Sequence, residues 1–354
     1  MKAVYRRKNP EGGSCSYILD EKVNLPSELG EHELRIKVKA CGLSRNDTVI
    51  DKICRTKTND IPVGHEVAGV VLEVGSAVKT YEKGSRIAGL LPLDWPFSGL
   101  ADECIISEYD TVTLPDSVSY TDAAGLLGDG VKAYTALYYL GRACAGDTVL
   151  IVDAASSWAS LAVQLAQSWG TKVLGTVSSD EEKYYLDELP SPLGNIFEVH
   201  SQNGLLTSAV LEETGGIGVD VILAENVKQF TNEEDEELTA LHEDWRKQPS
   251  KHDLISCLAV GGRLITSQSN LQLDPPHSEL LYLRGATVGF LFPGCWSLSS
   301  AQYGRFQHMM KEIIDKLSKR ILKPNIKKRI QVNDAIEMLP FIYNQRVGKI
   351  VVEL

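Results

Sequence analysis

Residues 149–166 contain the side chains of this chain that are best placed to bind a phosphate. A β-branched run leads through Asp153, Ala155, Ser156 and Ser157 into a helix with apolar periodicity. In a strand–turn–helix unit of this kind, free amides and the helix dipole attract the pyrophosphate of a dinucleotide to the helix N-terminus. The pattern therefore predicts the first strand and helix of a Rossmann domain.

The glycines that usually build such a turn are missing. A G-x-G-x-x-G pattern would fall near Asp153, at Ala155 or Ser156, and at Ala159. Side chains at the first two positions are expected to weaken phosphate binding, whereas alanine is accepted at the last, packing position. Serine hydroxyls, however, can donate to a phosphate. We predict that a dinucleotide still binds and that the residues of this turn contact it: Ala155, Ser156, Ser157 and Trp158.

The end of the next predicted strand, 172–177, indicates which dinucleotide would bind. NAD-dependent proteins usually place an Asp or Glu there for the ribose hydroxyls. This chain has Ser178 and Ser179 after Val177, so no carboxylate is expected to exclude a 2′-phosphate. Ser178 and Lys183 could receive that phosphate, which favours NADPH over NADH. The alternative for Lys183 is an exposed helix lysine beside acidic neighbours.

Two different patterns of elements must position these residues. The first third alternates short apolar strands with glycine turns, at 33–41, 67–75 and 86–91, and predicts a β-barrel-type domain. From about Thr121 helices and strands alternate, which is typical of an α/β fold with a doubly wound parallel sheet. The expected strands there are 148–152, 172–177, 220–223, 262–267 and 287–292, and the expected helices are 123–140 and 160–169.

Two later segments complete the organisation. An acidic run within 231–252 interrupts the alternation and is expected to be a solvated insertion. After the last of those strands, an amphipathic pattern at 300–322 leads to a strand at 349–353. Because the chain returns to a strand after the parallel sheet is complete, we expect the C-terminus to rejoin the first domain.

Composition excludes several classes of protein. The 354 residues are 43% hydrophobic and 23% charged, which is enough for two globular cores. The net charge of -11 argues against broad binding to nucleic acid or to an anionic membrane. No run reaches the roughly 18 apolar residues of a membrane span, and no signal-like apolar core follows the N-terminus. The seven cysteines are scattered singly, so we expect reduced, mostly buried thiols in a cytoplasmic protein.

Longer motifs resemble a known family along the whole chain. The stretches IPVGHEVAGVVLEVGSAV, DAAGLLGDGVKAYTALYYL, ETGGIGVDVIL and RVGKIVVEL resemble the medium-chain dehydrogenase/reductase superfamily, in its zeta-crystallin or quinone oxidoreductase branch. The resemblance implies a GroES-like catalytic domain made of 1–121 and 293–354, and a Rossmann domain at 122–292. It also implies a cleft for NADPH and substrate between these domains, and a homodimer that pairs through the apolar edge strand 285–292.

The same resemblance raises the question of zinc, because Gly64-His65-Glu66 matches a motif of zinc-dependent alcohol dehydrogenases. A catalytic zinc needs three protein ligands and an open position. At two positions where these relatives carry cysteines, this chain has Ser44 and Gly128. We therefore expect no zinc and a structural or general polar role for His65.

Without zinc, the family's chemistry is hydride transfer from nicotinamide to the β-carbon of a quinone or enone. Members of the zeta-crystallin branch carry Asn and Tyr where this chain has Ser44 and Val49. Ser44 is thus the predicted catalytic hydrogen-bond donor to the acceptor. Asn46 and Asp47 could also turn inward, although an aspartate in this setting more often stabilises a turn.

Further cofactor contacts are carried over from the resemblance alone, at strand ends and at the domain crossover. Lys132 is expected to supply a positive contact or to pair with Asp129. Phe290 and Phe292 are expected to fill core rather than to line the cofactor. The remaining predicted contacts are Asn226, Ser267 and Lys349.

Two functions stay open. The first is an NADPH-dependent reductase of a small quinone or enone, whose distinguishing feature is a working anion site at the helix near Ser156. The second is a catalytically impaired pseudoenzyme that keeps the fold for protein interaction, which the altered turn, the missing tyrosine and the acidic insertion favour. The complete order of motifs places the reductase ahead, although a fold alone does not establish an activity.

Overall fold

Two compact units make up the computed structural model of this chain: Lys132–Phe292 forms one, and Met1–Val131 with Pro293–Leu354 forms the other. The structure describes all of residues 1–354 except 10–14, 46, 48–57, 190, 199–204 and 229–247. The boundary after Val131 lies within helix α2 (Tyr120–Tyr134), ten residues beyond the end of the first domain inferred from the sequence.

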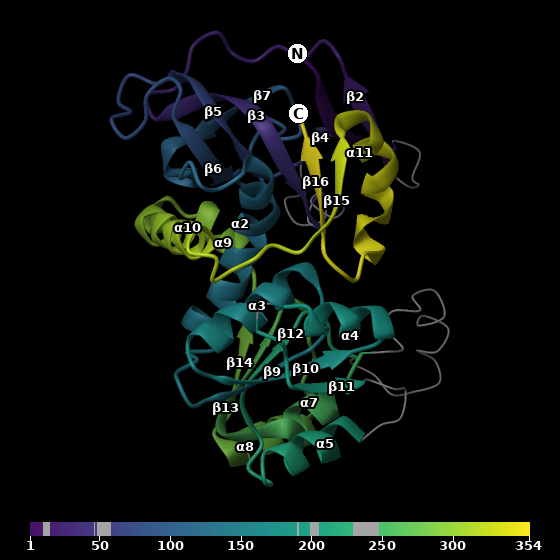
Figure 1. Ribbon diagram of the computed structural model, residues 1–354. Coiled ribbons are helices and arrows are strands. Elements are labelled where there is room, and N and C mark those ends of the chain that lie inside the picture. The colour runs from purple at the N-terminus through teal and green to yellow at the C-terminus, as the bar shows by residue number, and fades with distance from the viewer. Residues whose placement is uncertain (10–14, 46, 48–57, 190, 199–204, 229–247) are drawn as a thin grey trace. The chain divides into compact units, whose positions relative to one another are not determined.

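The unit Lys132–Phe292 is built on a parallel sheet (Figure 1). Its spatial order is β11-β10-β9-β12-β13-β14, so the chain builds the sheet outward from β9 in one direction and then returns to extend it in the other. Ligands of open parallel sheets bind beside such a switch point, at the carboxyl ends of the strands. The strands are β9 (Thr148–Ile151), β10 (Lys172–Val177), β11 (Asn195–Glu198), β12 (Val219–Ala224), β13 (Leu258–Thr266) and β14 (Thr287–Phe290).

Helices lie on both faces of this sheet (Figure 1). Alternate strand residues such as Leu150, Ile222 and Leu264 join one core cluster with Val210 and Leu254 from the helices of one face. Because both faces are covered, the central strands are apolar on both sides. The helices of that face are α5 (Leu205–Glu213), α7 (Lys251–Cys257) and α8 (Pro275–Arg284); α3 (Ser157–Ser168) and α4 (Asp180–Asp187) lie on the other.

The other unit carries a mostly antiparallel sheet ordered β15-β16-β3-β5-β6-β8, with β7 also paired to β3, and a small sheet ordered β2-β1-β4. The C-terminal strand β16 pairs with β3, so the end of the chain rejoins the first domain as we expected. The strands are β1 (Ala3–Arg7), β2 (Ser16–Asp20), β3 (Glu33–Leu43), β4 (Asp60–Pro62), β5 (Glu66–Val74), β6 (Arg86–Leu90), β7 (Glu103–Ser107), β8 (Thr111–Thr113), β15 (Ile326–Gln331) and β16 (Lys349–Glu353). Its helices include α9 (Gly294–Ser297), α10 (Tyr303–Ser318) and α11 (Val332–Met338).

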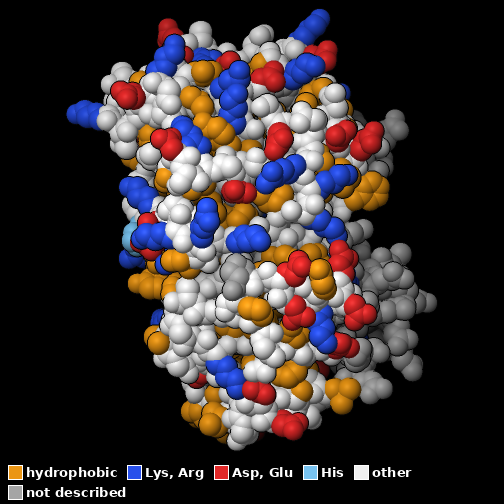
Figure 2. All heavy atoms as spheres, viewed as in Figure 1, with side chains coloured by type: hydrophobic (Ala, Val, Ile, Leu, Met, Phe, Trp, Pro, Cys, Tyr) orange, Lys and Arg blue, Asp and Glu red, His pale blue; other side chains and the backbone are white. Residues whose placement is uncertain are grey.

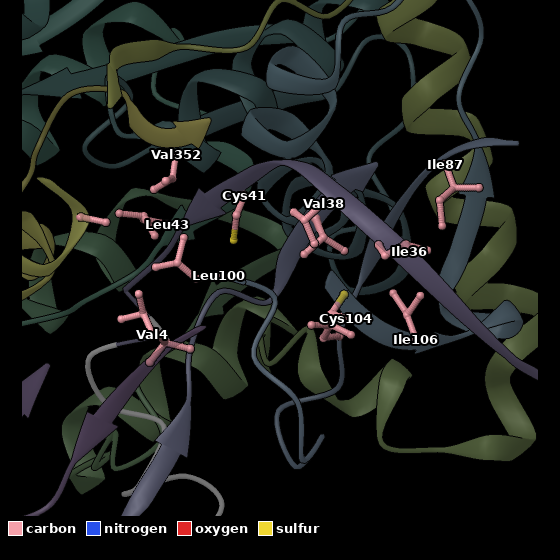
Figure 3. Packing of buried hydrophobic residues seen from close by; sticks show 14 of the residues in the cluster. Val4, Ile36, Val38, Cys41, Leu43, Ile87, Leu100, Cys104, Ile106 and Val352 are labelled. Carbon is pink, nitrogen blue, oxygen red and sulfur yellow. The ribbon is translucent and has the colours of Figure 1, made fainter. Parts of the chain in front are cut away.

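Strand β3 supplies much of the core of this unit (Figure 3). From Glu33 to Lys39 its apolar residues alternate with polar ones, and Leu34, Ile36 and Val38 are almost completely buried. Cys104 and Val352 from neighbouring strands join the same cluster. The period of two in the sequence thus directs one face of β3 into the core.

Several element boundaries differ from the sequence expectation. The helix expected at 123–140 divides into α2 and a π-helix, Thr135–Leu140. Helix α3 begins at Ser157 rather than at 160, and β14 ends at Phe290. The acidic run lies outside the described residues. Of 231–252 the structure describes 248–252, where α7 begins at Lys251. None of the helices in the described ranges combines the length and apolar character that crossing a membrane requires.

The cysteines are free thiols in the described part of the chain, as expected. Cys41, Cys104 and Cys257 are buried, but Cys144 and Cys295 are exposed, so burial is less general than the sequence suggested. Cys15 is half-buried, and Cys54 lies outside the described residues.

Candidate dinucleotide and acceptor sites

The turn between β9 and α3 has a residue with a Cβ in the left-handed conformation where a glycine was expected. Asp153 takes the first glycine position and adopts the left-handed conformation, with φ of 51°. Asp and Asn accept this region more readily than other residues with a Cβ. The amides of Asp153 and Ala154 donate to Thr176 at the end of β10, to its Oγ1 and its carbonyl oxygen respectively, both at 3.0 Å. The neighbouring strand therefore holds the turn in place.

Ser156 and Ser157 stand where a phosphate would approach the helix. Ser156 is the N-cap of α3 and makes no side-chain capping bond, and both serines are half-buried. The first-turn amides of a helix have no partner within the helix, and the dipole adds partial positive charge there. Ala155 and Ala159 are buried and fill packing positions. The Ser156 amide already donates to the Asp153 carbonyl oxygen over 2.9 Å. The first-turn amides from Ser157 on and the two serine hydroxyls are suitable donors for a dinucleotide pyrophosphate.

Two carboxylates adjoin this turn. The Gln248 side-chain amide donates to Asp153 Oδ2 over 2.6 Å. The indole of Trp158, in the first turn of α3, donates to Oε2 of Glu225 over 2.8 Å. Glu225 directly follows β12. Negative charge this close to an anion site opposes phosphate binding unless it is balanced.

The Lys132 ammonium balances the negative charge of Glu225. Its Nζ lies 2.6 Å from Glu225 Oε1 and 4.6 Å from the centroid of the Trp158 ring. The expected alternative, an ion pair between Lys132 and Asp129, is wrong: Asp129 pairs with Lys349. The three side chains of Trp158, Glu225 and Lys132 form one cluster beside the turn, in which the ammonium offsets the charge of Glu225.

The strand end that was predicted to contact the ribose differs from the sequence expectation. Ser178 follows β10 directly, and its amide donates to Glu182 Oε2 over 2.7 Å. Its hydroxyl lies 3.0 Å from the other oxygen of the same carboxylate. The prediction that no carboxylate stands here is therefore wrong, because Glu182 returns from the first turn of α4. Lys183 pairs with Glu198 at 3.7 Å rather than with its acidic neighbours in the sequence.

The remaining predicted contacts of this unit lie after β12, β13 and β14. Asn226 follows Glu225 and is half-buried. The hydroxyl oxygen of Ser267 is buried and has no hydrogen-bond partner in the described part of the chain. Phe290 and Phe292 are 55% and 39% exposed, so the expectation that they fill core is wrong. Among the described strands, β14 stands at the edge of this sheet.

In the other unit, Asp47 organises the segment that carries Ser44. The carboxylate is completely buried and accepts hydrogen bonds from the amides of Ser44 and Gly64, both at 2.8 Å. His65 Nδ1 lies 2.9 Å from it. Burial opposes ionisation, but these bonds and His65 prevail and lower the pKa of Asp47. Asp47 therefore stabilises the turn, as we expected.

Ser44 remains a candidate hydrogen-bond donor for an acceptor. It is half-buried, and its Oγ is 3.4 Å from Asp47 Oδ2, a long contact that a closer acceptor could replace. Asn46 and Val49, the neighbouring positions considered with it, lie outside the described residues.

Lys349 is a buried member of an ionic cluster. Its ammonium lies 2.6 Å from Glu66 Oε2 and 3.0 Å from Asp129 Oδ2, and its side chain is 3% exposed. Burial disfavours its charge, yet the two carboxylates raise the pKa of Lys349. Burial raises the pKa of Glu66 to about 7. Both carboxylates that pair with Lys349 belong to its own unit. Its predicted contact with the cofactor stays a prediction.

Gly128 and His65 lie where zinc-dependent relatives would place metal ligands. A Cβ at Gly128 would lie 2.4 Å from Glu66 Cδ, so the Glu66 carboxylate fills the space that a side chain there would use. His65 has one ring nitrogen committed to Asp47. Within the described ranges, no group of three or more His, Cys, Asp or Glu side chains could hold a metal ion.

Sequence reasoning does not single out Glu182, Glu225 or Gln248. Glu225 directly precedes Asn226, so its position after β12 was a usable signal. Glu182 and Gln248 contact the site only because the chain folds back, and no spacing rule indicates that contact.

A Rossmann sheet with a phosphate-type turn, joined to a unit with an antiparallel sheet, defines the class of protein. Residues 30–138 match the family model of the alcohol dehydrogenase GroES-like domain. The chain is 38% identical to mouse (Mus musculus) quinone oxidoreductase-like protein 1 over 354 residues, which cover all of both chains. The chain therefore belongs to the medium-chain dehydrogenase/reductase superfamily, in its quinone oxidoreductase branch, which confirms the resemblance seen in the sequence.

Solved structures show the same fold at lower identity. The enoyl reductase CurK superposes with a TM-score of 0.77 at 20% identity, over 99% of each chain. A mycobacterial protein solved in complex with NADPH gives a TM-score of 0.79 at 20% identity, over 100% of each chain.

Proposed function

We propose that this chain is a zinc-independent reductase that uses a reduced nicotinamide dinucleotide to reduce a small quinone or enone. The observation that carries the proposal is the β9–α3 turn, which has a left-handed residue at Asp153 and leads into the N-terminus of α3 at Ser157. The NADPH complex of a structural neighbour and the names of a quinone oxidoreductase-like relative and an enoyl reductase support the chemistry.

In this proposal, the dinucleotide supplies the hydride, and the residues of the chain bind and orient. The Ser157 amide and the hydroxyls of Ser156 and Ser157 hold the pyrophosphate at the helix N-terminus. Lys132 keeps the charge of Glu225 from repelling it. Ser44 donates a hydrogen bond to the acceptor oxygen, where negative charge develops as hydride arrives. The net charge of -11 supports a small-molecule substrate rather than nucleic acid.

The proposal includes a homodimer formed through β14. This strand is the edge of its sheet, and Phe290 at its end is 55% exposed. An uncovered apolar edge favours pairing with a second copy.

The test is dinucleotide-dependent reduction of a panel of quinones and enones by wild type and Ser156→Asp. An aspartate is a good N-cap, so the helix should fold, but its charge would repel a phosphate. We expect the rate to fall about tenfold or more. Ser278→Asp, the same change in α8, should leave the rate unchanged. A rate that survives Ser156→Asp would contradict the site.

The pseudoenzyme alternative has one observation in its favour: Asp153 and Glu225 both place carboxylates at the turn. If these charges prevail, folded wild type binds no dinucleotide, and Glu225→Gln or Asp153→Gly restores binding. The fold would then serve protein interaction.

A further inference from the structure

We propose that Glu182 makes this chain select NADH over NADPH, by occupying the hydrogen-bond donors that a 2′-phosphate would need. The inference rests on the proposed dinucleotide site and reverses the cofactor preference that the sequence suggests. It assigns the selectivity to a carboxylate that folds back onto the strand end rather than to a residue of the strand end itself.

The geometry starts from Ser178, the first residue after β10. Both of its available donors point to Glu182: the amide at 2.7 Å from Oε2, and the hydroxyl at 3.0 Å from Oε1 and 3.2 Å from Oε2. Strand β10 pairs in parallel with β9, so this strand end lies along the same edge of the sheet as the phosphate turn. The second strand of a Rossmann unit ends beside the adenosine ribose.

The position of Glu182 is fixed. It is 3% exposed, and its own amide donates to the side chain of Ser179, the N-cap of α4, over 3.3 Å. A 2′-phosphate could take the Ser178 donors only by moving this carboxylate, which would leave a buried charge without its hydrogen bonds.

The acidic side chains near Ser178 also disfavour a 2′-phosphate. The first turn of α4 carries Asp180, Glu181 and Glu182, and Figure 2 shows red carboxylate side chains over this part of the unit. The nearby Lys183 ammonium is shared with Glu198. A phosphate monoester carries about -1.5 to -2 charge at neutral pH and would be repelled. A ribose 2′-hydroxyl is neutral and can donate to a carboxylate.

The test is a calorimetric titration of NADH and NADPH into wild type, Glu182→Gln and Glu182→Ala. Wild type should bind NADH about tenfold or more tightly than NADPH. Either substitution removes the charge and should shift the ratio of the two dissociation constants toward NADPH by about tenfold or more. Circular dichroism checks that the variants fold.

Glu181→Gln is the matched control, because it removes the same charge from an exposed neighbour in the same turn. It should change the ratio by less than about threefold, since exposed charges are screened. Tighter NADPH binding by wild type, or an unchanged ratio in both Glu182 variants, would overturn the inference. If wild type binds neither dinucleotide, the proposed function fails. NADPH binding gained by Glu182→Gln and not by Glu181→Gln would then still support the role of Glu182, and its absence would overturn it.

Discussion

Asp47 is the single residue on which the local structure around Ser44 depends most. Its buried carboxylate satisfies two amides and approaches His65. Asp47→Ala would leave these donors without an acceptor, so we expect a loss on the order of 3 kcal/mol in the free energy of unfolding. Urea denaturation measures it. Asp116→Ala, at a fully exposed side chain, should cost less than about 0.5 kcal/mol. Equal losses would contradict the assigned role.

Glu66 should make stability depend on pH. Its pKa of about 7 in the folded protein lies above the roughly 4.3 of an exposed glutamate. Between these values the folded state holds a proton that the unfolded chain has lost. The stabilisation that comes from this group is thus complete below about pH 4 and is lost as pH rises through about 7.

Glu66→Gln stays neutral and removes this dependence. Between pH 5 and pH 8, we expect wild type to lose on the order of 2 kcal/mol of unfolding free energy relative to the variant. Chemical denaturation at several pH values measures the difference. Parallel stability curves for the two proteins would show that Glu66 is ionised throughout.

The residues of the site could be predicted from the sequence only in part. Ser156, Ser157 and Ser178 follow from the position of strand ends, because a buried strand before a periodic helix fixes where a ligand would lie. The partners that set their charge, Glu182 and Glu225, could not be predicted. Their contacts depend on how helix and loop side chains fold back in three dimensions.

At the scale of elements, the close approach of β3 to α2 depends on Gly42. A Cβ there would lie 2.2 Å from the carbonyl oxygen of Ala124, a backbone atom that cannot move aside alone. We expect Gly42→Ala to cost about 3 kcal/mol of unfolding free energy. Gly304→Ala in α10 meets nothing within 4 Å and should stabilise by about 0.5–1 kcal/mol. Thermal unfolding measures the midpoint temperature of both variants. A shift of both midpoints in the same direction would contradict this packing.

Strands were easier to predict than helix boundaries. The alternation in β3 and the apolar run of β10 determine both elements, since burial of one face or both leaves a periodic pattern. The start of α3 at Ser157 and the change to a π-helix after Tyr134 have no such pattern. They depend on packing against other elements.

At the scale of the whole molecule, the proposed homodimer can be tested at β14. Light scattering after size exclusion should give about twice the 38.9 kDa chain mass. Phe290→Glu places a charge on the proposed interface and should shift the mass toward the monomer. A monomeric wild type, or a dimer that is unaffected by the substitution, would place the interface elsewhere or exclude it.

The central claim is that the unit Lys132–Phe292 still binds a dinucleotide although its turn lacks the usual glycines. The most direct measurement is calorimetric titration of folded wild type with NADH, and separately with NADPH, at moderate salt. We predict saturable binding with one site per chain, tighter for NADH and lost in Ser156→Asp. No heat with either dinucleotide, from protein shown to be folded, would contradict the claim and favour the pseudoenzyme.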